Sequence, residues 1–116
     1  MENVIKVDVA HLSESSLEAI KNTKTPLKFL ISLNAWDRES YQKINNRDEF
    51  FLILANICDL KTSENVSVEA ELIYNSKECF TKLTELSKYL IENFEVPCTL
   101  KIDSKYNSFD ELPETI

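Results

Sequence analysis

The single histidine of this chain lies beside a group of serines, the arrangement that nucleophilic catalysis would need. His11 is followed by Ser13, Ser15 and Ser16, and a serine hydroxyl becomes a nucleophile when a neighbouring base takes its proton. The start of a helix explains the same residues, because a serine hydroxyl caps the first turn of a helix. The pattern therefore predicts Ser13 as a helix N-cap and His11 as a polar residue that ends the preceding strand. We expect no catalytic residues here.

The cysteines have neither metal-binding nor disulfide spacing. Cys58, Cys79 and Cys98 are odd in number, lie far apart and each fall in an apolar periodic segment. Such residues are typical of buried free thiols in a reducing compartment, which predicts a cytoplasmic protein. With one histidine and no Cys-x-x-Cys pair, we expect neither a metal site nor a cofactor.

Glycine is absent from all 116 residues. Phosphate-binding loops and the nucleophile elbow of acyl-transfer enzymes both depend on glycine. Its absence weighs against these enzyme classes, and we expect a protein that is not an enzyme. The neighbouring carboxylates of Glu69 and Glu71 leave one alternative, a small carboxylate-dependent enzyme that could use Mg²⁺.

Acidic residues are concentrated in the second half of the chain. The net charge is −7, and residues 48–116 hold fourteen acidic and six basic residues, whereas residues 22–47 hold five basic and two acidic ones. An acidic protein repels nucleic-acid phosphates and attracts basic protein surfaces. We therefore expect a basic protein partner, with no nucleic-acid partner. The longest apolar run, residues 50–55, is too short to span a membrane, so we expect no membrane partner either.

Two sets of residues are candidates for partner binding. The acidic set is Glu69, Glu71, Asp110, Glu111 and Glu114, and the aromatic and basic set is Trp36, Arg38 and Tyr41. Tryptophan, tyrosine and arginine are enriched at binding hot spots. The concrete hypothesis is an inhibitor or immunity-type protein that blocks a basic toxin or nuclease. A nucleic-acid accessory role for residues 36–47 and a homodimer through an open sheet face are alternatives.

The hydrophobic pattern switches between period two and a helical period. It predicts strands over 4–10, 27–33, 66–74 and 96–103 and helices over 14–22, 36–44, 47–60 and 76–94. Asn46 and Asn75 are predicted to cap the last two helices. The segment 47–60 is apolar nearly all round, which predicts a helix at the centre of the core, with a buried strand as the competing interpretation.

The strands alternate between apolar and polar residues, which indicates a sheet with one covered face. We therefore predict an α+β fold, a two-layer sandwich of about four strands with helices mainly on one face, ferredoxin-like or related. Residues 1–103 form one globular domain in this interpretation. Residues 104–116 are expected to be a loosely attached acidic tail.

Overall fold

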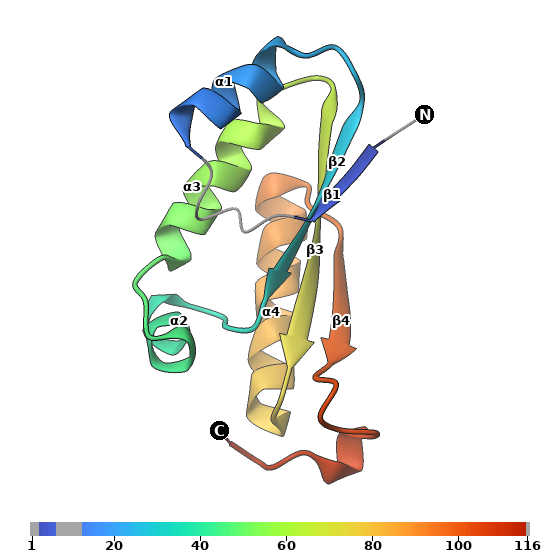
Figure 1. Ribbon diagram of the computed structural model, residues 1–116. Coiled ribbons are helices and arrows are strands. Elements are labelled where there is room, and N and C mark those ends of the chain that lie inside the picture. The colour runs from blue at the N-terminus through green and yellow to red at the C-terminus, as the bar shows by residue number, and fades with distance from the viewer. Residues whose placement is uncertain (1–2, 7–12, 116) are drawn as a thin grey trace.

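The computed structural model describes residues 3–6 and 13–115, in which a sheet of parallel strands is packed against helices (Figure 1). The elements in chain order are β1 (Asn3–Lys6), α1 (Glu14–Asn22), β2 (Leu27–Leu33), α2 (Arg38–Asn45), α3 (Phe50–Lys61), β3 (Val66–Tyr74), α4 (Lys77–Phe94), β4 (Cys98–Ile102) and the 3-10 helix η2 (Phe109–Glu111). The predicted mixture of helices and strands is thus confirmed.

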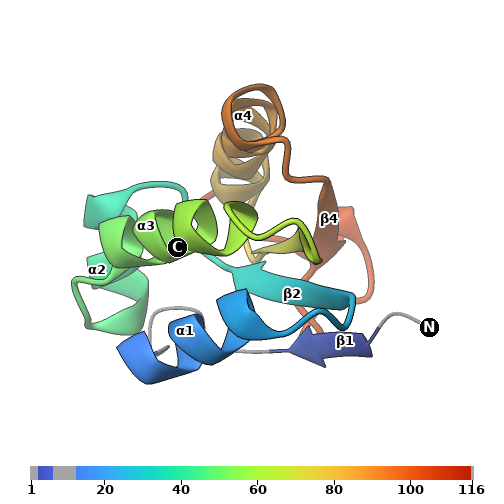
Figure 2. The same cartoon turned by 90° about the horizontal axis from the view of Figure 1, so that it is seen from above.

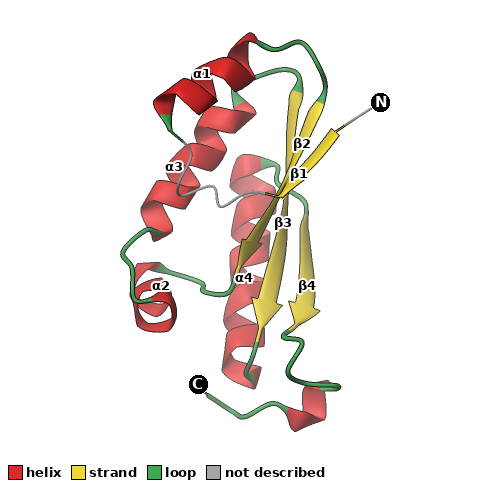
Figure 3. Ribbon diagram, in the orientation of Figure 1, coloured by secondary structure: helices red, strands yellow, loops and turns green. Residues whose placement is uncertain are grey.

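The strands lie in the sheet in the order β1-β2-β3-β4, and every neighbouring pair is parallel. Each connection advances the chain by one strand in the same direction, and right-handed connections then place every helix on the same face. Figures 2 and 3 show this arrangement, with the helices on one side of the strands. The ferredoxin-like prediction is therefore wrong, because that arrangement requires antiparallel neighbours.

The core lies between the covered face of the sheet and the helices α3 and α4. Six inward residues of the two central strands are buried: Phe29, Ile31, Leu33, Val68, Ala70 and Leu72. At the strand ends on the same face, Leu27, Val66 and Tyr74 are partly buried. From α4, Leu83, Leu86 and Leu90 pack against this face, while Phe80 and Phe94 on the same helix are partly exposed. The alternation in the strands thus reflects one covered and one open face.

The helix α3 is not at the centre of the core. It packs against β3, α1 and α2, and Phe50, Ile53, Ile57 and Leu60 are buried. Phe51 and Leu52, however, are 61% and 46% exposed. The prediction of a central helix is wrong because the single layer of helices gives α3 a sheet on one side only.

Of the three helix-capping residues predicted from the sequence, one is confirmed and two are wrong. Ser13 accepts a hydrogen bond from the Ser16 N–H at 3.2 Å, as predicted. Asn46 ends α2 instead of starting α3, and Ser76 instead of Asn75 caps α4. The predicted strand residues 7–10, and His11, lie outside the described residues.

Two described residues adopt the left-handed backbone conformation without being glycine: Asn46 has φ 57° and Glu95 has φ 54°. The side chain of glutamate clashes with the backbone in this region, whereas asparagine tolerates it. We expect Glu95→Gly to raise the free energy of unfolding by about 0.5–1 kcal/mol, as measured by urea denaturation. Asn46→Gly is the matched control with a smaller gain, and a loss of stability in Glu95→Gly would contradict the argument.

Candidate partner-binding site at the carboxyl edge of the sheet

A cavity of about 720 Å³ opens at the edge of the sheet where the parallel strands end. Its lining comes from the loop after β2 and from α2, from the start of α4, and from the C-terminal segment: Trp36, Asp37, Glu39, Ser40, Lys43, Ile44, Asn75, Glu78 and Thr115. In open α/β sheets, ligands bind outside the carboxyl ends of the strands. The cavity is therefore the candidate binding site of this fold.

The loop between β2 and α2 is held by hydrogen bonds around Ser40. The buried Ser40 hydroxyl accepts from the N–H groups of Trp36 and Asp37, both at 3.0 Å. In return, the Asp37 carboxylate accepts from the Ser40 N–H at 2.7 Å, which completes a capping box. The backbone beside the half-buried Trp36 ring is thus fixed at the cavity.

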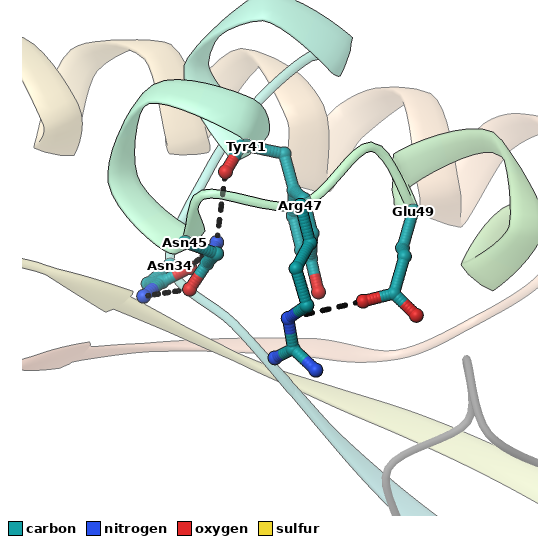
Figure 4. A network of polar contacts seen from close by, with 5 residues as sticks. All are labelled: Asn34, Tyr41, Asn45, Arg47 and Glu49. Atoms are coloured by element: carbon teal, nitrogen blue, oxygen red, sulfur yellow. Dashed lines mark hydrogen bonds and ion pairs between the residues drawn. The ribbon is translucent and has the colours of Figure 1, made fainter.

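An amide pair joins the end of β2 to the end of α2 (Figure 4). Asn34 donates to Asn45 at 3.2 Å, and Asn45 donates back to Asn34 at 3.0 Å and to the Tyr41 carbonyl at 3.2 Å. Beyond this pair, Arg47 forms an ion pair with Glu49 at 3.1 Å. These contacts set the direction in which α2 leaves the sheet, and so the position of Glu39 and Lys43 on the cavity wall.

The C-terminal segment packs against the start of α4, in contrast to the loose attachment expected. The N–H groups of Lys77 and Glu78 donate to the carbonyls of Pro113 and Glu114, both at 2.9 Å. Leu112 is buried.

Aromatic rings hold the same segment in place. The Phe109 ring lies 5.2 Å from that of Phe80, which in turn lies 4.9 Å from that of Tyr74. The segment therefore completes the wall of the cavity at Thr115.

The acidic residues predicted for partner binding are divided between two places. Glu69 and Glu71 lie on the open face of the sheet, and each forms an ion pair across strands, with Lys28 at 2.8 Å and Lys101 at 3.3 Å. The strand face that was predicted to be acidic therefore carries lysines beside its carboxylates.

The acids of the C-terminal segment are exposed. Asp110 and Glu111 lie in η2, and Glu111 accepts from the Asn107 N–H at 2.9 Å. Glu114 forms an ion pair with Lys77 at 3.4 Å and directly precedes Thr115 on the cavity wall. Glu114 thus lies next to the cavity that Trp36 lines, at the carboxyl edge of the sheet.

Arg38 and Tyr41 do not accompany Trp36 at the cavity. Arg38 is exposed and binds both carboxylate oxygens of Asp48, at 2.8 and 2.6 Å, and these hydrogen bonds lower the pKa of Asp48 below its ordinary value. Tyr41 is 6% exposed, and its ring packs near that of Phe50. Since Arg47 also has an acidic partner, two of the three basic residues in 36–47 have their charge opposed within the chain.

Three acidic residues at the cavity were not predicted as site residues: Asp37, Glu39 and Glu78. In the sequence they resemble the acids that commonly begin helices, and they come from two distant segments. Only the pairing of β2 with β3 brings the two helix starts to one edge. One sequence feature would have predicted them. Asp37 and Glu39 follow β2, and Glu78 follows β3, so all three lie just after predicted strands.

The cysteines differ from one another in exposure, although all three are free. Cys58 is exposed, which corrects the prediction that it is buried. Cys79 is buried and Cys98 is half-buried, and burial raises the pKa of Cys98 to about 11.

Residues 3–6 and 13–115 contain no group of three or more His, Cys, Asp or Glu side chains that could hold a metal ion. None of the helices in this part of the chain has the length and apolar character needed to cross a membrane.

Comparison of the chain with protein-family models, with curated proteins and with solved structures found no match.

Proposed function

We propose that this protein is a non-enzymatic binding protein that attaches to a basic protein partner through the carboxyl edge of its sheet, in the manner of an inhibitor or immunity-type protein. The observation that carries the proposal is the convergence of Trp36 with Asp37, Glu39 and Glu78 around one cavity. An aromatic residue surrounded by charges of one sign is a combination that gives both affinity and partner selection.

The distribution of charge favours this edge over the open sheet face. Glu69 and Glu71 each lie against a lysine, so their attraction for an outside cation is reduced. At the cavity, three carboxylates are opposed by Lys43 as the one cation among the lining residues. A patch with an excess of acidic residues accelerates association with a basic partner.

Two charge reversals distinguish the surfaces. With a partner captured from the source organism, we expect Glu39→Lys with Glu78→Lys to lower the association rate constant at least tenfold at low ionic strength. Added salt should slow the wild-type protein in the same way, because it screens the attraction between exposed charges. Stopped-flow or surface-plasmon kinetics at 20 and 300 mM salt measure both effects.

The matched control is Glu69→Lys with Glu71→Lys, which changes the net charge by the same amount. We expect it to alter the association rate less than threefold. Equal effects of the two double variants would show that only net charge matters, and a larger effect of the control would place the interface on the open sheet face. Either result contradicts the proposal.

A further inference from the structure

Three backbone N–H groups on the β2–α2 side of the cavity already donate hydrogen bonds within the chain. The N–H groups of Trp36 and Asp37 donate to the Ser40 hydroxyl, and the Ser40 N–H donates to the Asp37 carboxylate. The start of a helix ordinarily binds anions through such N–H groups. Here the chain's own oxygens take these three donors away from any ligand.

The same holds on the α4 side. The N–H groups of Lys77 and Glu78 donate to carbonyls of the C-terminal segment, and that of Cys79 donates to the Ser76 hydroxyl at 2.9 Å. The first turn of α4 is thus capped by residues of this protein. A phosphate or carboxylate ligand would have to displace them.

Acidic residues, in contrast, outnumber basic ones along the cavity. Its lining includes Asp37, Glu39 and Glu78, with Lys43 as the one basic residue. Asn75 also lines it, and within the described part of the chain its buried Oδ1 has no hydrogen-bond donor. The cavity therefore suits a ligand with positive charge and several N–H groups.

Trp36 adds a face on which a cation can stack. Trp36 is half-buried and lines the cavity, and tryptophan is the best aromatic partner for a cation. A guanidinium group stacks on such a ring while its edge donates to carboxylates, because it is planar and carries five N–H groups. The ammonium group of a lysine carries the same charge but lacks the planar array of N–H groups.

We infer that the cavity receives the guanidinium group of an arginine side chain from the basic partner, stacked on Trp36 and hydrogen-bonded to Glu39 and Glu78. The inference rests on the proposed function, since it names the chemistry by which that partner is recognised at the same site. It also explains how an exposed acidic edge could select among basic proteins, because stacking and paired hydrogen bonds depend on geometry as well as on charge.

Trp36 is the only tryptophan in the chain, so its fluorescence reports on the cavity without a label. The probe is a blocked tripeptide with arginine between two glycines, compared with the same peptide carrying citrulline, which has nearly the same shape but no charge. We expect a saturable change in Trp36 emission with the arginine peptide, and at least tenfold weaker binding of the citrulline peptide. A lysine peptide should bind between the two.

The variant Glu39→Gln with Glu78→Gln should weaken binding of the arginine peptide about tenfold. The matched control is Glu64→Gln with Glu92→Gln, which removes the same charge from exposed positions that do not line the cavity and should change the affinity less than twofold. Circular dichroism and thermal unfolding of all variants show whether the fold is retained. Because both pairs are replaced by the isosteric amide, a difference between them reports on the site.

Equal binding of the arginine and citrulline peptides, or equal effects of the two glutamine pairs, would overturn the arginine assignment and leave the proposed function standing. The opposite outcome is also distinguishable. In that case the cavity binds the arginine peptide as described, but Glu39→Lys with Glu78→Lys does not change the association rate with the partner. That pattern would overturn the proposed function while supporting the ligand chemistry of the cavity.

Discussion

Replacing Leu83 with alanine is expected to lower the free energy of unfolding by about 3–5 kcal/mol, the upper part of the range for large-to-small changes in a core. Leu83 is completely buried in the middle of α4, which packs against β3 and β4. Truncation removes apolar contacts and leaves a cavity that the sheet behind it fills poorly. Because a domain of this size is stable by about 5–15 kcal/mol, the loss should be evident in urea denaturation.

Ile91→Ala on the same helix is the matched control. Ile91 is 48% exposed, so its truncation should cost less than about 1 kcal/mol. The comparison holds helix and residue size nearly constant and varies only burial. A loss below 1 kcal/mol for Leu83→Ala would show that this stripe of α4 does not face the sheet.

The thiols should differ in reaction rate by at least a hundredfold. We expect Cys58 to react with a chromogenic disulfide reagent as an exposed thiol does, and Cys79 and Cys98 to react only as the fold opens. Burial raises the pKa of Cys98 to about 11, so about 0.1% of it is thiolate at pH 8, and thiolate is the reactive form. Native protein should therefore release one equivalent of chromophore in the fast phase.

Denaturation in urea should release all three equivalents, which measures the total. The variant Cys58→Ser identifies the fast phase, because it should remove that phase and leave the slow reaction unchanged. Two or more fast equivalents in native protein would contradict the burial of Cys79 or Cys98. A fast phase that persists in Cys58→Ser would contradict the exposure of Cys58.

The strands were predictable because each central strand has one covered face. Residues 27–33 and 66–74 alternate in the sequence, and the strands β2 and β3 have these bounds. The direction of the strands was not predictable, because alternation reports which faces are covered and says nothing of parallel or antiparallel pairing. The exposure of Phe51 and Leu52 on α3 was not predictable for a related reason. A continuous apolar run indicates that a helix is buried, but not which of its faces is covered.

The candidate site was only partly predictable. Trp36 was singled out by its residue type, and the structure places it at the cavity. Asp37, Glu39 and Glu78 belong to segments separated by α3 and β3, and their proximity follows from strand register alone. Tyr41 was predicted from the same aromatic character as Trp36, yet helical periodicity turns its ring into the core beside Phe50.

The all-parallel sheet also has a consequence for the order in which the chain can assemble. No two neighbouring strands of the described sheet are joined by a hairpin, so each pairing closes a loop that contains at least one helix. Leu27 of β2, for example, pairs with Val66 of β3, so this pairing cannot form until Val66 has been synthesised. Contacts between residues distant in sequence slow folding. During synthesis, β2 therefore presents an unpaired edge until β3 has emerged, and such an edge exposes the nascent chain to aggregation during that interval.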